Sequence, residues 1–459
     1  MKLASKRLII SFLLLTYTCL LVMFSLNPDQ FFMIASGNDV LNGHLTYNTN
    51  LQMNYVLQQW LYSVVLAFID NHFGYVGDIL FTLIQNIVLW FLSYKFLKKK
   101  IKSDFWATII PIVLILINFF YVISVRPSTI TLILLLSEIL ILEKYKETKD
   151  WKQLFWLIPV LILLANVHQS IYLYCGIVAM PYMIEGKKLD WKVIISGLLM
   201  LPISLLTPYG LDGALYIFRA MIIGQKYIRI QEMQSASANI AIYAYVCLAI
   251  IGLVGVNYFK KANKFINFYM ILTICMTIMT LRSILFIFIP MLFIAKNFDF
   301  SVFSDVKIFK ESLVTTIVMS ALTVLILFNA PALITFDLND ELDLVEHYIA
   351  LEIPKDAKIY NVPDSGGILE YNGYNIYLDT RPDAYDKENT ERFREFSIID
   401  GGINGARYVS DTEILKETEK FEYLITYTNS RLDNIYRDMN YEPLYRNDMY
   451  AIYKSNLLY

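Results

Sequence analysis

Long apolar runs separated by short polar breaks fill this chain up to about residue 335, and they constrain its fold more than any other feature. Of the 459 residues, 56% are hydrophobic and 17% are charged, and the mean hydropathy is +0.48. Because an ordinary soluble domain does not need so much apolar sequence, the composition predicts an integral membrane protein. The net charge of −2 argues against a nucleic-acid partner, which would favour a strongly basic surface.

Lysine and arginine are segregated between the polar breaks. Six breaks carry nearly all the lysine, at Lys2/Lys6, Lys95–Lys102, Lys144–Lys152, Lys187–Lys192, Lys260–Lys264 and Lys296–Lys310. The intervening breaks carry mostly arginine, namely Arg126, Arg219, Arg229 and Arg282, together with Lys226. Since cationic short loops mark the cytoplasmic side of a membrane protein, the lysine-rich breaks are predicted inside and the arginine-bearing breaks outside.

Alternating the apolar runs between these two sides gives a consistent expectation for the fold. We expect a polytopic α-helical protein of the plasma membrane, with about eleven transmembrane helices over residues 1–334. The N-terminus is expected in the cytoplasm, and residues 27–74 are expected to form an external loop with amphipathic helices. In that loop, Leu57–Ile69 is predicted to be a helix in the membrane interface, a depth that suits Trp60.

The composition becomes mixed and polar from about Thr335, which predicts an extracytoplasmic α/β domain over residues 335–459. Its expected elements are a helix at Asp340–Leu351, strands at Lys358–Asn361, Asn375–Asp379 and Tyr423–Thr426, and a hairpin formed by Tyr441–Arg446 and Met449–Lys454. These short strands with intervening helical patterns are typical of a small mixed domain.

The first external loop carries the sharpest candidate for chemistry. Asp29 directly follows the first apolar run, and Asp39 lies ten residues further along. A carboxylate fixed at this place can act as a general base on an acceptor hydroxyl. The alternative is that Asp29 caps the helix that follows, where aspartate is a preferred residue. Position alone favours the cap somewhat, and Asp39 is the weaker candidate for the base.

Arginine side chains predict a phosphate site. Arg126 and Arg282 lie at the tips of two tight helical hairpins, and the loop between residues 207 and 237 adds Lys226, Arg229 and Glu232. Arginine binds phosphate oxygens in a fixed bidentate geometry, so these cations are candidates for holding a phosphate. The alternative is that they reach the membrane surface and pair with nearby carboxylates.

Four further polar residues are weaker candidates. Asn166 and His168 lie in another outer hairpin, and Asp379 and Arg381 follow a predicted strand, where loops often carry binding groups. A lone histidine at a helix junction is more often a packing residue, and an internal ion pair explains Asp379 and Arg381 equally well. The chain has no phosphate-binding glycine loop, zinc motif or metal-like cysteine spacing. We therefore expect no cofactor, and the sequence leaves a divalent metal ion open.

A series of short motifs carries a family resemblance. The segments are Asp29-Gln-Phe-Phe-Met-Ile-Ala-Ser-Gly37, Gln58-Gln59-Trp60-Leu61, Arg126-Pro127, Ala165-Asn-Val-His168, Pro208-Tyr-Gly210, Arg282 before Pro290, and Gly366-Gly367 with Asp379-Thr-Arg381. In this order they resemble bacterial GT-C type glycosyltransferase-like membrane proteins, whose first loop reads approximately D-x-W-W-H-I-x-x-G and is followed by H-E-W-L. The family histidine is Met33 here and the glutamate is Gln59, which leaves open a changed substrate or a relative that no longer catalyses.

The resemblance implies an inverting glycosyltransferase that moves a sugar from a polyprenyl-phosphate donor to a cell-surface glycan or polymer. In such an enzyme Arg126, Arg282, Arg229 and Lys226 would hold the phosphate, and Asp29 would orient or deprotonate the acceptor. The alternative is a non-enzymatic transporter or scaffold for lipid-linked glycans in surface-polysaccharide assembly. That class predicts charges along a path through the bilayer, whereas Glu138 is the main charge inside a predicted span.

Overall fold

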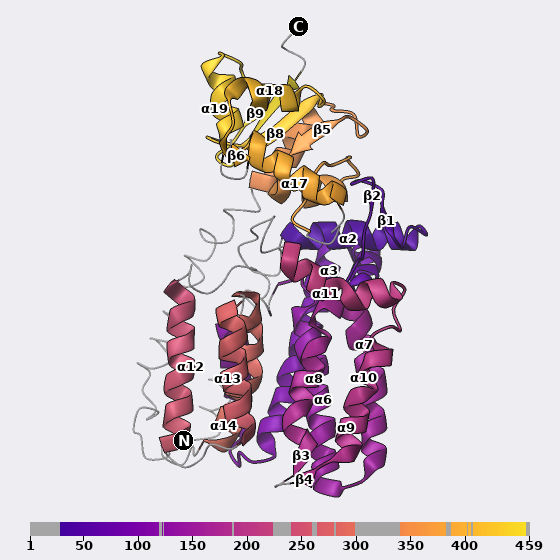
Figure 1. Cartoon of the computed structure of the whole chain (residues 1–459), viewed down its shortest axis with the longest axis vertical. Helices are drawn as coiled ribbons and strands as arrows, with labels where there is room; N and C mark the ends of the chain where they lie inside the picture. Colours follow the sequence, from indigo (N-terminus) through magenta and orange to yellow (C-terminus); the bar gives the residue numbers. More distant parts are fainter. Residues whose placement is uncertain are drawn as a thin grey trace. The chain divides into compact units, whose positions relative to one another are not determined.

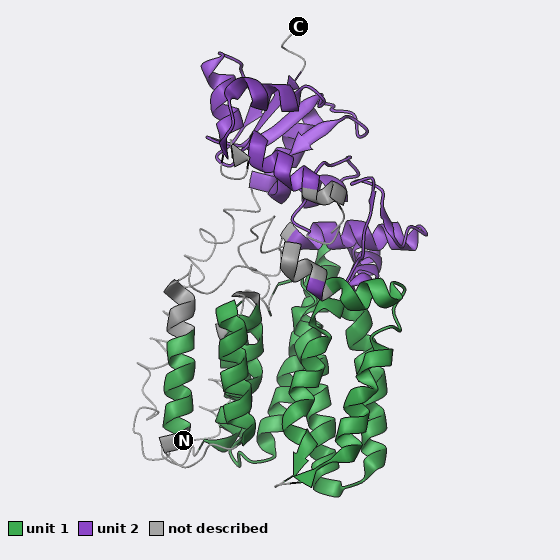
Figure 2. Cartoon of the chain, in the orientation of Figure 1, with its two compact units in different colours: residues 1–25, 75–217, 230–331 green, residues 26–74, 218–229, 332–459 purple. Residues whose placement is uncertain are grey.

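The structure is a computed structural model of the chain. It describes residues 28–118, 122, 124–185, 188–223, 240–258, 264–279, 281–298, 340–381, 387–401, 403–404 and 407–455. Two compact units share the chain, and each has its own apolar core. Unit 1 comprises residues 1–25, 75–217 and 230–331, and unit 2 comprises residues 26–74, 218–229 and 332–459 (Figure 2).

Unit 1 is a bundle of helices (Figure 1). They are the second part of α3 (Trp60–Lys98), α4 (Asp104–Ile117), α6 (Ser128–Thr148), α7 (Leu157–Val167), α8 (Leu173–Ala179), α9 (Trp191–Leu198), α10 (Met200–Ile203), the first part of α11 (Gly210–Ile223), α12 (Ile240–Tyr258), α13 (Lys264–Met279) and α14 (Phe288–Asn297). Short connecting elements are η1 (Trp151–Trp156), η2 (Gln169–Ile171), η3 (Met180–Met183), η7 (Leu281–Ile287), β3 (Ile184–Glu185) and β4 (Lys188–Leu189).

Helix α6 lies against α7, α8 and η1. Its residues Leu132, Leu135, Ile139 and Leu142 recur at helical spacing, which places them on one side, and all four are buried. Burying one such side chain contributes about 1.5–3 kcal/mol to stability.

Helix α6 ends at Lys149, which adopts the left-handed conformation at φ 57°, a common way for a helix to end.

The predicted fold class, a polytopic protein with about eleven transmembrane helices, is wrong for the part of the chain that the structure describes. One helix there, α3, is long and apolar enough to cross a membrane, and the other apolar helices have 10–17 residues. The expected multi-pass location in the plasma membrane, with the N-terminus inside and the C-terminal domain outside, is corrected with it, because no multi-pass topology is present among these helices.

The physical reason for this correction is that the apolar runs are divided into helices too short to cross a membrane. The run 154–184, for example, becomes η1, α7, η2, α8 and η3. A helix that is apolar on all sides suits a protein core as well as a lipid environment, so run length alone does not separate the two. The predicted first and last spans, Leu8–Leu26 and Leu313–Phe328, lie outside the described residues.

Unit 2 combines helices with short strands (Figure 1). Its elements are α2 (Pro28–Leu41), β1 (Tyr47–Asn48), β2 (Met53–Asn54), the first part of α3, a helix at 340–350, β5 (Ile359–Asn361), α16 (Pro363–Tyr371), α17 (Lys387–Ile399), β6 (Ile403–Asn404), β7 (Arg407–Tyr408), α18 (Asp411–Thr418), β8 (Tyr423–Tyr427), α19 (Arg431–Asp438), β9 (Tyr445–Arg446) and β10 (Tyr450–Lys454). The four-stranded sheet has the order β5-β8-β10-β9. Strand β5 pairs in parallel with β8, and the other pairs are antiparallel.

Most of the predicted elements in this segment are confirmed. The helix expected at Asp340–Leu351 is present at 340–350, and the strands expected at Lys358–Asn361 and Tyr423–Thr426 are β5 and β8. The hairpin is formed by β9 and β10 and pairs Ala451 with Arg446. The centre of β8 and most of β10 are buried, so both strands consist mainly of apolar and aromatic residues that are recognisable in the sequence.

The strand predicted at Asn375–Asp379 is wrong, because this extended segment joins no sheet. A side chain takes the place of a neighbouring strand: Oδ1 of Asn361 accepts hydrogen bonds from the backbone N–H groups of Tyr377 at 2.7 Å and Leu378 at 3.2 Å. Nδ2 of Asn361 donates to the Leu378 carbonyl at 2.7 Å. The amide of Asn361 therefore satisfies the polar backbone groups that a strand partner would otherwise pair.

Two glycines fix the course of the first helices in unit 2. Gly74 has φ 59° and ψ −163° and breaks α3, so the helix predicted at Leu57–Ile69 is a separate segment as expected. Gly37 lets α2 lie directly on that segment. A Cβ atom at this position would lie 2.1 Å from the Ser63 carbonyl oxygen and 2.7 Å from the Ala67 Cβ.

Replacing Gly37 with alanine is expected to destabilise the protein by about 1–3 kcal/mol, because the added methyl group meets backbone that must move. The denaturant-unfolding midpoint measures this loss. Gly255→Ala is the matched control, since a Cβ there meets nothing within 4 Å. An unchanged midpoint for Gly37→Ala would show that the two helices separate at little cost.

Candidate functional site

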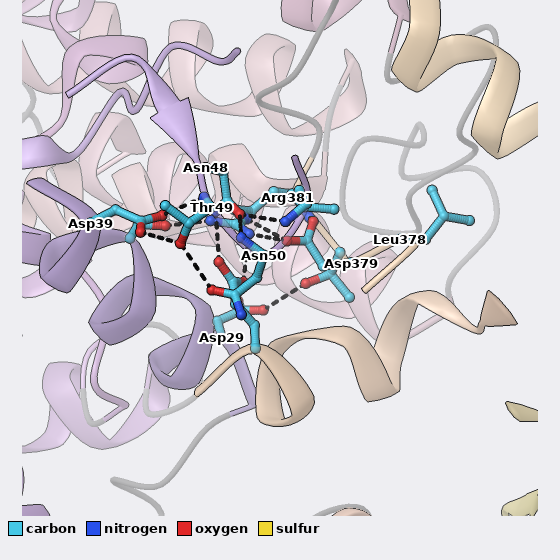
Figure 3. Close-up of polar contacts among 12 residues, drawn as sticks. Asp29, Asp39, Asn48, Thr49, Asn50, Leu378, Asp379 and Arg381 are labelled. Atoms are coloured by element: carbon cyan, nitrogen blue, oxygen red, sulfur yellow. Dashed lines mark hydrogen bonds and ion pairs between the residues drawn. The ribbon is translucent and has the colours of Figure 1, made fainter. Parts of the chain in front are cut away.

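Asp29 lies in the first turn of α2, where Pro28 occupies the first helical position. A negative charge in this turn is favoured by the helix dipole. The Asp29 side chain is half-buried, and its Oδ1 accepts a hydrogen bond from the Thr380 hydroxyl at 3.4 Å. Figure 3 shows Asp29 beside the segment that carries Asp379 and Arg381. Asp29 therefore contacts the Thr380 hydroxyl and remains partly accessible.

The Arg381 guanidinium is the centre of a buried charge cluster (Figure 3). Its Nη2 lies 2.6 Å from Oε2 of Glu370, and it also contacts the Asp379 carboxylate and the Ser36 hydroxyl. Arg381 is 3% exposed. The internal ion pair, which was one of the two interpretations of Asp379 and Arg381, is therefore present in the structure.

Aromatic rings cover the same guanidinium. Its central carbon lies 5.0 Å from the centre of the Phe32 ring and 5.6 Å from that of Tyr55. Burial alone would lower the pKa of Arg381, but the Asp379 and Glu370 carboxylates outweigh it and raise this pKa. The guanidinium therefore stays charged while its donors are used inside the protein.

Glu370 links this cluster to the β1–β2 hairpin. Its Oε1 accepts from Nδ2 of Asn48 at 2.6 Å, and Oδ1 of Asn48 accepts from the backbone N–H groups of Asn50 at 3.1 Å and Leu51 at 2.7 Å. Burial raises the pKa of Glu370 to about 7, although the Arg381 charge opposes the shift. The carboxyl group consequently holds a proton more tightly than an exposed glutamate does.

Asp39, near the end of α2, fixes the same hairpin. Its Oδ1 accepts from the Thr49 hydroxyl at 2.6 Å, and its Oδ2 accepts from the Thr49 backbone N–H at 3.1 Å (Figure 3). Burial raises the pKa of Asp39, and the two Thr49 hydrogen bonds oppose that effect. Since Asp39 is 5% exposed, its position suits a structural role better than contact with an acceptor.

The two positions where the chain departs from the family pattern lie in the interior. Met33 is 1% exposed in α2, and Gln59, 5% exposed, immediately precedes α3. The backbone carbonyl of Gln59 accepts from the Ser63 N–H at 2.9 Å in the first turn of that helix. Both uncharged side chains thus occupy core positions.

Three predicted site residues lie in unit 1. Nδ2 of Asn166 donates to the carbonyls of Ile162 at 2.8 Å and Leu206 at 3.0 Å. Nδ1 of buried His168 lies 2.8 Å from the Thr131 hydroxyl. These contacts join α7 to neighbouring segments, as expected for packing residues. The Arg126 side chain is half-buried in the turn that precedes α6.

Lys226, Arg229 and Glu232 lie outside the described residues, as does the side chain of Arg282, whose backbone is in η7. Glu370, Ser36, Asn48 and Thr380 also belong to the site, and none of them was predicted as a site residue from the sequence. An acidic residue directly after the apolar pair Ile368-Leu369 was the available signal for Glu370.

No family model matches the chain, and no curated protein matches it significantly.

Replacing Arg381 with alanine is expected to lower stability by about 3–5 kcal/mol, because two buried carboxylates lose the charge that compensates them. The unfolding midpoint in denaturant measures the change. Arg407→Ala is the control, since Arg407 pairs with Glu413 while 65% of its side chain is exposed, and its midpoint should stay close to wild type. Similar midpoints for both variants would contradict the central role of Arg381.

Glu370→Gln is expected to change how stability depends on pH. Glu370 binds its proton more tightly in the folded chain, with a pKa of about 7, than in the unfolded chain. The contribution of the Glu370 carboxyl group to the free energy of unfolding is therefore present at low pH and is lost as the pH rises from about 4.5 through about 7. Unfolding midpoints measured at pH 5 and pH 8 test this. Between pH 5 and pH 8 the midpoint of wild type should fall relative to that of Glu370→Gln. Asp400, whose pKa burial raises to about 6, is present in both proteins, so its effect cancels.

Proposed function

We propose that this chain is a glycosyltransferase that moves a sugar from a polyprenyl-phosphate donor to a hydroxyl group of a glycan or polymer, with inversion. Asp29 accepts the proton of that hydroxyl. One observation carries the proposal: Asp29 is half-buried, whereas Asp39 and Asp379 are enclosed by internal hydrogen bonds and ion pairs. Among these three carboxylates, Asp29 is the one that an acceptor can reach.

The reaction is a single displacement at the anomeric carbon. The acceptor oxygen forms a bond to that carbon while the bond from the carbon to the phosphate oxygen breaks, and the electron pair leaves with the phosphate. The acceptor proton passes to the Asp29 carboxylate, which contributes about 10²–10⁴-fold to the rate as a general base. Charge that develops on the leaving phosphate needs cationic partners. Arg126, Arg282, Arg229 and Lys226 stay predictions for this part.

The surroundings of Asp29 support this role because a base must be held in a fixed geometry. Its partner Thr380 lies between Asp379 and Arg381 in the sequence, and both neighbours are buried and paired. The Thr380 hydroxyl donates to Oδ1 at 3.4 Å, which helps to orient the carboxylate. The Arg381 cluster thus acts as a positioning element for the base.

A second candidate is a protein that binds lipid-linked glycans without catalysing their transfer. The observation that favours it is that the two family residues with acid–base or metal-binding capacity are replaced by Met33 and Gln59, which are buried and uncharged. In that case Asp29 would be a helix-terminal residue that stabilises α2. The two candidates differ in whether the Asp29 charge is required for a covalent product.

Asp29→Asn should reduce sugar transfer by about 10²-fold or more while the protein remains folded. The measurement compares the envelope glycans of a deletion strain that expresses either wild type or the variant at equal levels. Loss of one defined sugar on deletion, restored by wild type only, is the expected result. Asp356→Asn removes a similar charge from an exposed site of unit 2 and should restore the sugar fully. Full restoration by Asp29→Asn would favour the non-enzymatic candidate.

A further inference from the structure

A lysine-rich cavity of about 360 Å³ lies in unit 1, within the size range of small-molecule sites. Its wall includes Lys99 and Lys100 from the turn after α3, Lys146 from α6, and Lys296 from α14, with Glu143 and Glu147 from α6. All of these residues belong to unit 1, so the cavity is formed within one compact unit. It plays no part in the proposed function and does not depend on it.

Positive charge exceeds negative charge around this cavity. Lys99 lies 3.0 Å from Glu147, and Lys296 lies 2.7 Å from Glu143. The side-chain partner of Lys100 is the neutral amide of Asn297. The cavity wall has four lysines and two glutamates, and the adjoining ion pairs add Lys149, Glu185 and Asp190. Together these are five ammonium groups and four carboxylates. The surplus favours an anion.

Lys296 is held unusually deep for a lysine. Its side chain is 13% exposed, and its Nζ lies 4.0 Å from the centre of the Phe96 ring. Burial lowers the pKa of Lys296, and Glu143 opposes this effect. A second anion next to this ammonium group would favour its charged form further.

The Tyr182 hydroxyl is an independent indication of a ligand. Tyr182 lines the cavity and is 2% exposed, and its hydroxyl forms no hydrogen bond with another residue in the described ranges. A buried hydroxyl without a partner is unfavourable, so such groups usually meet a ligand or an ordered water molecule. Burial raises the pKa of Tyr182, so the group remains a hydrogen-bond donor.

Aromatic rings form the apolar side of the same cavity. The ring centres of Tyr182 and Phe265 are 4.9 Å apart, and those of Phe265 and Phe293 are 6.2 Å apart with nearly parallel planes. Cations on one side and rings on the other suit a molecule with an anionic group attached to an apolar or planar part. A phosphate group fits the anionic part better than a carboxylate because it accepts bonds from several donors at once.

We propose that this cavity binds a phosphate monoester or pyrophosphate, with Lys99, Lys100 and Lys296 around the phosphate oxygens. The Tyr182 hydroxyl donates one further hydrogen bond, and the remainder of the ligand lies on Phe265 and Phe293. The same chemistry is offered by the headgroup of an anionic lipid and by a free phosphate compound. The two sources are distinguished by the probes.

Purified full-length protein is titrated with sodium pyrophosphate, and separately with phosphatidylcholine vesicles that contain phosphatidic acid, against phosphatidylcholine alone. Saturable binding to pyrophosphate indicates a free phosphate compound, and binding only to the phosphatidic-acid vesicles indicates a lipid headgroup. Either result supports the site if the variants respond as expected. Tyr182→Phe and Lys100→Ala should each weaken binding about tenfold.

Stability provides a second measurement. Tyr182→Phe removes a buried hydroxyl, so its unfolding midpoint should equal or exceed that of wild type without ligand. Pyrophosphate or the phosphatidic-acid vesicles should raise the midpoint of wild type more than that of the variant. Lys152→Ala, an exposed lysine outside the cavity wall, is the control and should bind as wild type does. Absence of saturable binding to both probes, or equal binding by Tyr182→Phe, Lys100→Ala and Lys152→Ala, would overturn the proposal.

Discussion

The buried guanidinium of Arg381 is the interaction on which the described part of unit 2 depends. Removing this charge from water costs several kcal/mol, so it has to be surrounded by opposite charges and hydrogen-bond acceptors. Asp379 and Glu370 supply the charges, and Ser36 supplies a hydroxyl from α2. Gly366 makes the approach sterically feasible, because a Cβ there would lie 2.1 Å from the Leu378 carbonyl oxygen. One ion cluster thereby joins α2, α16 and the segment 378–381.

This arrangement separates structural from chemical roles among neighbouring polar residues. Arg381 and Asp379 use their polar atoms on each other and on Glu370, while Thr380 between them is directed to Asp29. The buried cluster therefore helps to fix the position of a half-buried carboxylate. Because a general base is effective only in a fixed orientation, the cluster affects chemistry through position and not through contact with the acceptor.

Local patterns predicted the strands β5 and β8 and the hairpin of β9 and β10, since alternation and turn residues are carried by adjacent positions. Features that depend on distant residues were not predictable in this way. The segment Asn375–Asp379 has strand-like composition, yet Asn361 pairs its backbone. Asn48 and Glu370 are 322 residues apart, and no local pattern relates them. Apolar run length likewise failed for the fold class, because a long apolar run can fold as several short helices as well as one membrane span.

Arginine was predicted at the phosphate site and lysine in the cytoplasmic breaks, but the neighbours of a cation matter as much as its residue type, as Arg381 and the lysine-rich cavity illustrate. Arg381 is saturated by two carboxylates and a hydroxyl, so an added anion would meet donors already in use. In the lysine-rich cavity, by contrast, Lys100 has a neutral partner and the Tyr182 hydroxyl has none in the described ranges. Whether a cation binds a ligand is therefore decided by its compensation within the fold, which depends on neighbours that are distant in sequence. Residue type sets the geometry of a contact, but local charge balance determines whether the contact is available.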